Sequence, residues 1–365
     1  MKHVFHIITH LDVGGAERVA FNIAKSDNPA IEYHIVEVVH SSSEFSKKII
    51  KELTNAGIIV HCSPYSIKKY AILMFWIWFK RLYIDLKPDV IHVHTEIPDL
   101  ALWVFRKIAW TYFWIHPIYI RTIHNTELWN DWKGIGRFVE RFYIRHHSNV
   151  AISQSTKECY ERAYGEKNIP IIYNGLEEVV QKPFDHIVKG KVNVLFAGRL
   201  EWQKGVDELL EVIVAFKNSN NLHFHIVGEG SYLEKIKTTI ESFSNVSLYD
   251  KIYGLSQYLG SFDYLFMPSN HEGLALMPIE ASLAHTPTVI NRCPGLRDTL
   301  PEDWPLAVDG NSVDAFIEIF SKDISEEKYK ELSGKAYMFA KENFSLKKMQ
   351  REYEQLYQNK EMNML

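Results

Sequence analysis

Two glutamates eight residues apart stand where an apolar run gives way to a helical pattern. The run Tyr264–Pro268 favours a strand, and Pro278 fits the first turn of a helix that the pattern predicts over Leu276–Ala284. Glu272 therefore falls in the loop before this helix, and Glu280 just inside it. Two carboxylates so placed could reach opposite ends of one ligand, while the unpaired N–H groups of the helix N-terminus hold its phosphates. A helix-capping carboxylate with a surface glutamate is the alternative.

Two cations flank a second loop, which follows the apolar run Asn193–Ala197. Arg199 and Lys204 lie near the two ends of this short loop, before a helical pattern that begins near Gly205. A guanidinium fork and an ammonium group beside a helix N-terminus could clamp a diphosphate. Two solvated surface cations are the alternative if this loop is taken alone.

Paired glycines follow the first apolar run of the chain, Val4–Thr9. Gly14 and Gly15 lie between this predicted strand and the helical pattern Ala16–Ala24, where a backbone without side chains can approach a bound group closely. The spacing is neither GxGxxG nor a Walker sequence, which argues against a nicotinamide-dependent dehydrogenase. Tight turns use paired glycines as often, so the pair is weak evidence by itself.

The elements that must position these loops alternate along the whole chain, short apolar runs with helical patterns, which predicts βαβ units around parallel sheets. At 365 residues the chain is long enough for two domains. We expect one domain over residues 1–180 and a second over 190–344, both doubly wound, with a polar linker over 177–191. The predicted strands are Val4–Thr9, Tyr33–Val39, Ile58–Cys62, Val90–His94, Ile118–His124, Val150–Ser153, Ile169–Tyr173, Asn193–Ala197, His223–Val227, Val246–Tyr249, Tyr264–Pro268 and Thr288–Asn291.

Ligands of such sheets bind beyond the carboxyl ends of the strands, and the cleft between two facing domains is the expected site. His92 and His94 lie in one predicted strand. We predict that their side chains point to opposite faces, that neither has a nearby set of zinc ligands, and that both are structural.

The composition, with 46% hydrophobic and 24% charged residues, excludes extended disorder. A formal net charge of −4 argues against a nucleic-acid partner. Three cysteines without a CxxC pair suit reduced thiols in the cytoplasm, and Met1–Thr9 predicts a strand rather than a signal peptide. The longest apolar run, Ala71–Phe79, is well short of the ~20 residues that span a membrane.

Tryptophan is concentrated in one basic stretch. Seven of the nine tryptophans fall within residues 66–146, which carry twelve basic and seven acidic side chains. Such a segment suits contact with an anionic membrane surface, because indole rings settle at headgroup depth and lysines meet anionic lipid. Core helices with solvated lysines on their outer faces are the alternative. The seven are Trp76, Trp78, Trp103, Trp110, Trp114, Trp129 and Trp132.

Taken in order, these motifs resemble the retaining GT-B glycosyltransferases, specifically family 4 (glycosyl transferases group 1). The resemblance rests on Gly14-Gly15, on GRLEWQKG at 198–205 and on HEGLALMPIEA at 271–281, which contains the Glu-x7-Glu hallmark. Lesser landmarks match in the same order, and the resemblance covers nearly the whole chain. These landmarks are PDVIHVH at 88–94, RTIH at 121–124, IYNG at 172–175 and DYLFMPS at 263–269.

The resemblance implies an α/β GT-B fold, in which two Rossmann-like domains face a cleft. The first domain would take the acceptor, and the last helix, within 345–365, would pack back on it. Glu280 would hold the nucleotide ribose, Arg199 and Lys204 would neutralise the diphosphate, and Glu272 and His124 would act catalytically at the donor sugar. The implied donor-binding residues are Gly14, Gly15, Arg199, Lys204, Gly273, Leu274, Ala275, Leu276 and Glu280.

The implied activity is retaining transfer of a hexose or N-acetylhexosamine from a nucleotide-diphosphate sugar, with UDP favoured over GDP as the nucleotide. The acceptor would be a saccharide, such as one linked to polyprenyl diphosphate, in the assembly of bacterial surface polysaccharide. We expect no cofactor and no metal, because Asp-x-Asp is absent and cations can stabilise the leaving diphosphate. The enzyme would be cytoplasmic, or peripheral on the inner face of the plasma membrane.

Three points stay open at this stage. A sugar-nucleotide epimerase on the same fold, or a non-catalytic sugar-nucleotide-binding module, would use the same donor residues. Acceptor attack on the same face as the leaving group is the expected mechanism, with Glu272 as nucleophile only if it reaches the anomeric carbon. The family usually has glycine where His285 stands, which we attribute to a local variation of the turn.

Overall fold

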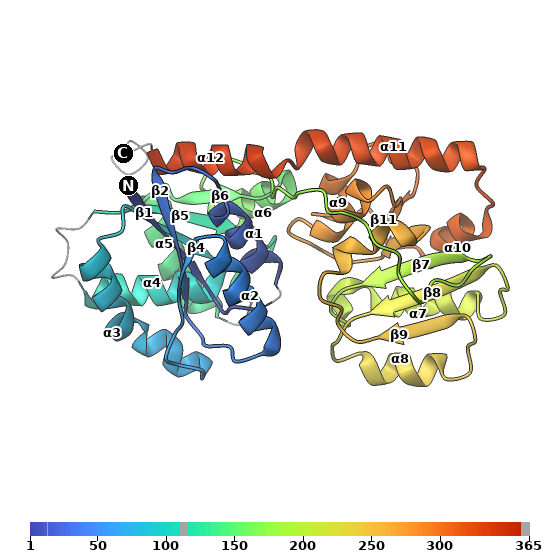
Figure 1. Ribbon diagram of the computed structural model, residues 1–365, viewed down its shortest axis with the longest axis horizontal. Helices are drawn as coiled ribbons and strands as arrows, with labels where there is room; N and C mark the ends of the chain where they lie inside the picture. The colour runs from blue at the N-terminus through green and yellow to red at the C-terminus, as the bar shows by residue number, and fades with distance from the viewer. Residues whose placement is uncertain (13, 110–115, 131, 359–365) are drawn as a thin grey trace. The chain divides into compact units, whose positions relative to one another are not determined.

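Two six-stranded parallel sheets form the cores of two separate units of the chain (Figure 1). The computed structural model describes residues 1–12, 14–109, 116–130 and 132–358. The first unit comprises Met1–Gly175 and Leu346–Leu365, and the second comprises Leu176–Ser345. Helices flank both sheets, so the predicted class of two Rossmann-like α/β folds is confirmed.

The first sheet has the strand order β3-β2-β1-β4-β5-β6, with every neighbouring pair parallel. Its direction of winding reverses between β1 and β4, and ligands of open α/β sheets bind at the carboxyl edge at such a point. The strands are β1 (Lys2–Ile8), β2 (Ile31–Glu37), β3 (Ile59–His61), β4 (Val90–His94), β5 (Ile118–Ile123) and β6 (Asn149–Ala151).

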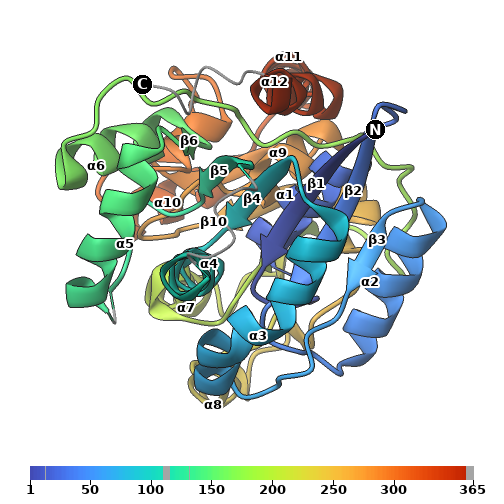
Figure 2. The ribbon, with the colours of Figure 1, turned by 90° about the vertical axis from the view of Figure 1, so that its left-hand side faces the viewer.

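Helices cover both faces of this sheet (Figure 2). Phe5 and Ile7 of β1 belong to an apolar core shared with α3 (Lys68–Leu86) and α4 (Glu96–Ile108). His6 points to the opposite face, where α12 (Leu346–Gln358) packs. The last helix therefore belongs to the first unit, where Gln350 donates to the backbone oxygen of Asn22 in α1. The helices are α1 (Gly15–Ala24), α2 (Glu44–Asn55), α3 (Lys68–Leu86), α4 (Glu96–Ile108), α5 (Lys133–Arg145), α6 (Gln154–Tyr164) and α12 (Leu346–Gln358).

A buried ion cluster ties the elements of the first unit together. The Arg121 guanidinium donates to Asp99 at 2.7 Å and, through two nitrogens at 2.8 Å each, to Glu140. The side chains of Trp129 and Tyr160 donate to the same Glu140 carboxylate at 2.6 Å. One arginine thus links β5 to α4 and α5 inside the core.

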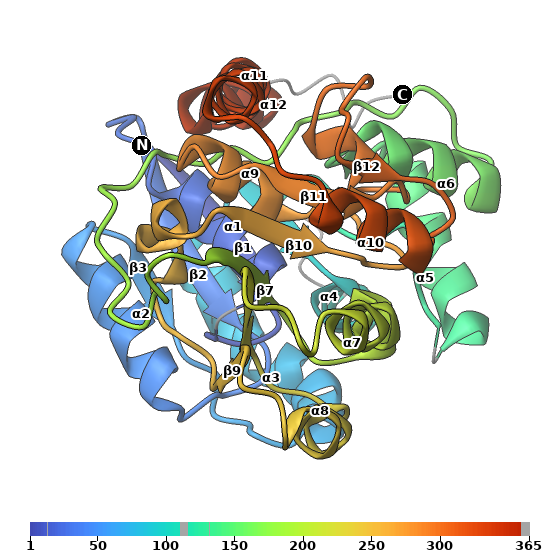
Figure 3. The same ribbon diagram turned by 90° about the vertical axis from the view of Figure 1, so that its right-hand side faces the viewer.

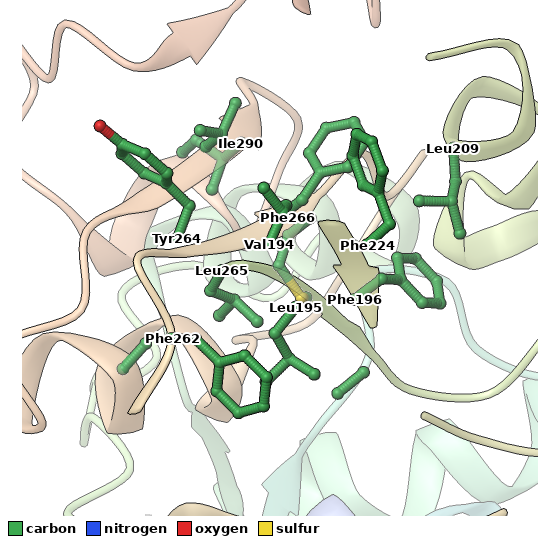
Figure 4. Close-up of a cluster of buried hydrophobic side chains, with 14 of the residues drawn as sticks. Val194, Leu195, Phe196, Leu209, Phe224, Phe262, Tyr264, Leu265, Phe266 and Ile290 are labelled. Carbon is green, nitrogen blue, oxygen red and sulfur yellow. The ribbon is translucent and has the colours of Figure 1, made fainter. Parts of the chain in front are cut away.

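The second sheet repeats the topology of the first, in the order β12-β11-β10-β7-β8-β9 with parallel neighbours (Figure 3). Its core packs apolar side chains from β7, β8 and β10 against helices, and Figure 4 shows Phe266 and Phe224 among them. Phe266 contacts Phe316 of α10 (Val313–Ser321) edge to face, at 4.9 Å between ring centroids. The strands are β7 (Val192–Ala197), β8 (Leu222–Val227), β9 (Val246–Tyr249), β10 (Tyr264–Met267), β11 (Thr288–Asn291) and β12 (Ala307–Val308).

The helices of the second unit lie on both sides of its sheet, with α7 beside α10 and α9 beside α11. Helix α9 follows the loop after β10 and starts where Pro278 predicts. The helices are α7 (Val206–Ala215), α8 (Leu233–Ile240), α9 (Leu276–Leu283), α10 (Val313–Ser321) and α11 (Glu326–Asn343).

The strand prediction is wrong at two places. Ile169–Tyr173 forms only an isolated bridge between Ile171 and Ala151, because Pro170 has no N–H to donate to a ladder. Strand β12 was not predicted, since two residues are too few to show a period. The predicted linker over 177–191 lies within the second unit, where the Lys182 N–H donates to the Gln257 oxygen.

The described tryptophans of the basic stretch pack on the first unit's core. Trp129 is buried, and Trp76, Trp78, Trp103 and Trp132 lie against it partly buried, while Trp110 and Trp114 lie outside the described residues. Among the described residues of this stretch, the exposed large apolar side chains are aliphatic except for one tyrosine and one phenylalanine. They are Ile67, Tyr70, Leu73, Ile77, Ile108, Ile135 and Phe138. No helix among the described residues has the length and apolar character required to cross a bilayer.

Candidate active site

The loops that carry Lys204 and Glu272 leave the carboxyl ends of two adjacent strands. β7 and β10 pair directly in the second sheet, at the point where its order reverses. The chain leaves β7 into residues 198–205 and leaves β10 into residues 268–275. Two loops that are remote in sequence therefore meet at the position where α/β sheets bind ligands.

The Lys204 ammonium contacts the Glu272 carboxylate, with 2.5 Å between Nζ and Oε1. The side chains are 17% and 8% exposed, so the pair is largely screened from water but still reachable. Because the Lys204 ammonium is already paired with Glu272, a phosphate that bound it on this edge would share it with that carboxylate.

Two glycines allow the loops to approach this closely. Gly205 has a φ of +68°, and a Cβ there would lie 1.8 Å from the Pro268 carbonyl oxygen. Gly295 has a φ of +81°, and a Cβ there would lie 2.3 Å from the Glu272 carbonyl oxygen. Any other residue at either position would push the loops apart, so these glycines set the position of the Lys204–Glu272 pair.

Arg199 is held in the same cluster. Its Nη2 donates to Gln203 Oε1 at 2.6 Å, and Gln203 Nε2 donates to the His271 carbonyl oxygen at 3.1 Å. The Asn270 side chain in turn donates to the Trp202 oxygen at 2.8 Å. These bonds cross-link the two loops and keep both cations on one edge of the sheet.

Helix α9 directs its N-terminus to this edge. Its N-cap residue, Ala275, makes no side-chain capping bond, so the N–H groups of the first turn are not capped by that residue. Leu274 and Ala275 are buried in the tight turn before the helix, which also includes Gly273. Glu280 is 7% exposed and lines a small pocket with Gln181, Ser256 and Leu283. A carboxylate there can accept from hydroxyl groups that enter the pocket.

In the first unit, the glycine loop does not leave an open helix N-terminus. Gly14 caps α1, and a Cβ on Gly14 would lie 2.1 Å from Glu17 Oε2, so the Glu17 carboxylate folds back over the first turn. Burial raises the pKa of Glu17 above its usual value. Only the absence of a side chain at Gly14 makes room for this carboxylate, while Gly15 has open space beside it.

His124 directly follows β5 and is 9% exposed. Its Nε2 lies 3.1 Å from His94 Nδ1, and His94 Nε2 lies 3.0 Å from His6 Nδ1. Burial lowers the pKa of His6 and of His124 to about 3, so both rings are neutral at pH 7. Three strands thus contribute a line of neutral imidazoles at the carboxyl edge of the first sheet.

The prediction for His92 and His94 was wrong on two counts. Residues two apart in a strand share a face, and the rings of these histidines stack at 4.2 Å between centroids. The nitrogens of His6, His92 and His94 also lie close enough together to surround one metal ion. A second such group, more exposed, consists of His3, Glu32 and His34 at the opposite end of the strands.

Two family models match nearly the whole chain. The model described as glycosyltransferase family 4 matches residues 13–178, and the one described as glycosyl transferases group 1 matches residues 181–338. The chain belongs to glycosyltransferase family 4. This membership confirms the resemblance that the ordered motifs indicated.

Relatives of this family 4 glycosyltransferase include a protein of a cps region and a glycosyltransferase of amylovoran biosynthesis. An uncharacterized 41.2 kDa protein in the cps region of Klebsiella pneumoniae is 27% identical over 326 residues, which cover 82% of this chain and 84% of the relative. The amylovoran biosynthesis glycosyltransferase AmsD of Erwinia amylovora is 33% identical over 156 residues, 40% of this chain and 43% of the relative.

Solved structures share the fold of this family 4 member. Anabaena Alr3699/HepE, crystallised in complex with UDP-glucose, aligns with a TM-score of 0.77 at 14% identity, covering 97% of this chain and 99% of that one. The glycosyltransferase from Rickettsia africae aligns with a TM-score of 0.76 at 17% identity, covering 98% and 97%.

The structure gathers Arg199, Lys204, Glu272 and the start of α9 on one sheet edge of this family 4 protein, with Glu280 on that helix. Gly14, Gly15 and His124 lie at the carboxyl edge of the other sheet. Sequence reasoning missed three contributors, namely Gln203, Glu17 and the His6–His94 pair that supports His124. Glu17 had a usable signal, because a glutamate at the third position of a helix often reaches back to its first turn.

Proposed function

We propose that the protein is a retaining, metal-independent glycosyltransferase that moves a hexose or an N-acetylhexosamine from a UDP-sugar to a saccharide acceptor. The observation that carries the proposal is the Lys204–Glu272 pair, which Arg199 and the α9 N-terminus flank on one sheet edge. The second unit would bind the donor, and the first unit would bind the acceptor.

The charges on this edge suit a leaving nucleoside diphosphate. Two cations and the N–H groups of a helix N-terminus can stabilise the negative charge that develops as the glycosidic bond breaks. The Glu280 carboxylate in its pocket would accept from the ribose hydroxyls. UDP is the favoured nucleotide, because a protein of the same fold was crystallised with UDP-glucose, and GDP is the second candidate.

The acceptor would attack from the same face as the leaving diphosphate, whose oxygen takes the hydroxyl proton. Glu272, already bound to Lys204, would orient the donor sugar near its reacting carbon. His124 is neutral, so it would serve as a hydrogen-bonding group to the sugar rather than as a strong acid.

We assign the acceptor to bacterial surface polysaccharide assembly, because the relatives named above belong to a cps region and to amylovoran biosynthesis. A polyprenyl-diphosphate-linked saccharide would bring the enzyme to the cytoplasmic face of the membrane. Exposed Tyr70, Leu73 and Ile77 lie along one stripe of α3, with basic Lys69 and Arg81 on the same helix, which suits an anionic bilayer surface.

The test incubates the purified protein with UDP-, GDP- and ADP-sugars, with and without a polyprenyl-diphosphate-linked saccharide, in EDTA. We expect transfer only when a UDP-sugar and the acceptor are both present, with the anomeric configuration of the donor retained in the product. Turnover of donor alone to a different sugar would identify an epimerase instead. Tight UDP binding without any product, unchanged in Glu272→Ala, would identify a non-catalytic binding module.

A further inference from the structure

Seven buried groups of the first unit form one continuous line of hydrogen-bonding contacts, from α12 to His124. The line starts at Tyr353 and runs through a threonine, a second tyrosine and three histidines. Its links are Tyr353 Oη to Thr122 Oγ1 (2.8 Å), Thr122 Oγ1 to His92 Nε2 (2.6 Å), His92 Nδ1 to Tyr357 Oη (2.9 Å), Tyr357 Oη to His6 Nε2 (3.5 Å), His6 Nδ1 to His94 Nε2 (3.0 Å) and His94 Nδ1 to His124 Nε2 (3.1 Å).

The number of hydrogens determines the direction of this line. Each of the seven neutral groups carries one imidazole or hydroxyl hydrogen, and each of the six links uses one of these hydrogens. One of the seven hydrogens therefore takes part in no link of the line. Every member except His124 is at most 1% exposed, whereas His124 is 9% exposed. An unmet donor inside the core is costly, so the outside hydrogen belongs on His124.

A single arrangement satisfies this condition. Tyr353 donates to Thr122, each group then donates to the next, and His94 donates through Nδ1–H to His124 Nε2. The reverse direction would leave the Tyr353 hydroxyl hydrogen without an acceptor, because Thr122 is its one recorded partner among the described residues. His124 must then carry its hydrogen on Nδ1.

We infer that Tyr353 and Tyr357 of α12 are positioning residues that fix the tautomer of His124, so that its Nδ1–H faces outward as a hydrogen-bond donor. The inference rests on the proposed function, in which His124 meets the donor sugar. The Nδ1–H of His124 would donate to an oxygen atom of the donor sugar, such as that of a hydroxyl group. The last helix thereby acts on His124 through this line of hydrogen bonds.

The same cluster does not suit a metal ion. Both nitrogens of His92 are engaged, one by Thr122 and one by Tyr357, so this ring has no lone pair left for a cation. Coordination of His92 through either nitrogen would break one of the two shortest histidine links in the line. Zinc binding by this cluster is therefore an outcome that would overturn the inference.

The test measures tautomers directly, by two-bond 1H–15N correlation on the full-length protein labelled at histidine, with His124→Asn used to assign the His124 signal. We expect Nδ1–H on His124 in the unaltered protein and a gain of the Nε2–H form in Tyr357→Phe. Tyr33→Phe is the matched control, since its ring lies 5.8 Å from His6 without a link in the line, and it should leave the tautomer unchanged.

Transfer kinetics supply the second readout. Tyr357→Phe should lower kcat/KM several-fold, and the same change in the His124→Asn background should have no further effect. An unchanged His124 tautomer in Tyr357→Phe, or stoichiometric Zn²⁺ uptake that His92→Gln abolishes, would overturn the inference. Because the tautomer is read without donor or acceptor, a failure of the proposed transfer reaction leaves this result interpretable.

Discussion

Lys204 and Glu272 lie 68 positions apart in the sequence, yet their side chains meet at 2.5 Å as an ion pair between the loops after β7 and β10. The pair brings together two groups that separate sequence motifs assign to different parts of a donor, the diphosphate and the sugar. On the proposed function, a diphosphate would compete with the Glu272 carboxylate for the Lys204 ammonium, so substitutions of these two residues should change diphosphate binding in opposite directions.

Replacing Lys204 by methionine should weaken UDP binding, and replacing Glu272 by glutamine should strengthen it several-fold, because the ammonium is then unshared. Both changes should lower the rate of sugar transfer. If the ammonium stabilises the leaving group, Lys204→Met should decrease kcat by a factor of about 10²–10³. Titration calorimetry with UDP measures the binding. Lys235→Met, which breaks an exposed pair with Asp207, is the control, and equal weakening by both site variants would contradict the competition.

Loss of Arg121 should destabilise the first unit strongly. Arg121→Met leaves the Glu140 and Asp99 carboxyls buried without their cation, which costs about 3–5 kcal/mol of unfolding free energy. Urea denaturation followed by tryptophan fluorescence measures it. The exposed pair Arg81–Asp85 provides the comparison, since Arg81→Met should cost less than about 1 kcal/mol. Similar losses in the two variants would show that the buried cluster is not a centre of stability.

The line of neutral histidines predicts acid sensitivity. The pKa of His6 and of His124 is about 3 in the folded state and 6.5 ordinarily, so only the unfolded chain takes up these protons as the pH falls below 6.5. The unfolding free energy should therefore decrease from pH 7.5 to 5.5, by about 1 kcal/mol for each such group. Urea midpoints at several pH values test this, and His124→Asn should show the smaller dependence. A stability that rises toward pH 5.5 would contradict it.

His285 takes the left-handed position after α9, with a φ of +61°, where glycine is the usual residue. Its ring stacks on Tyr337 at 4.3 Å, and its carbonyl oxygen accepts from Ser333. His285→Gly should change the unfolding free energy by less than about 1 kcal/mol, because relief of backbone strain offsets the lost stacking. Tyr337→Ala should cost less in that background than in the unaltered protein. Equal costs in a double-mutant cycle would show that the stack contributes nothing.

The secondary-structure elements around the candidate site follow from local sequence, whereas its side-chain contacts depend on residues that are remote in sequence. The strands that frame the site and the start of α9 at Leu276 were predictable from apolar runs and from Pro278. The contact between Lys204 and Glu272 was not, because it depends on backbone approaches at Gly205 and Gly295 that involve residues remote in sequence. The shared face of His92 and His94 was predictable from the two-residue period of a strand, and our prediction misapplied that period.

The assignment of α12 to the first unit has a consequence for how the protein is made. The ribosome releases residues 1–175 first, then the entire second unit, and only then the helix that carries Tyr353 and Tyr357. The part of this sheet that α12 covers therefore stays uncovered throughout synthesis of the second unit, although α1 already packs beside it. A chain that stops before residue 346 would contain both loops of the candidate site, 198–205 and 268–275, but would leave the histidine side chains under α12 exposed to water and to other nascent chains.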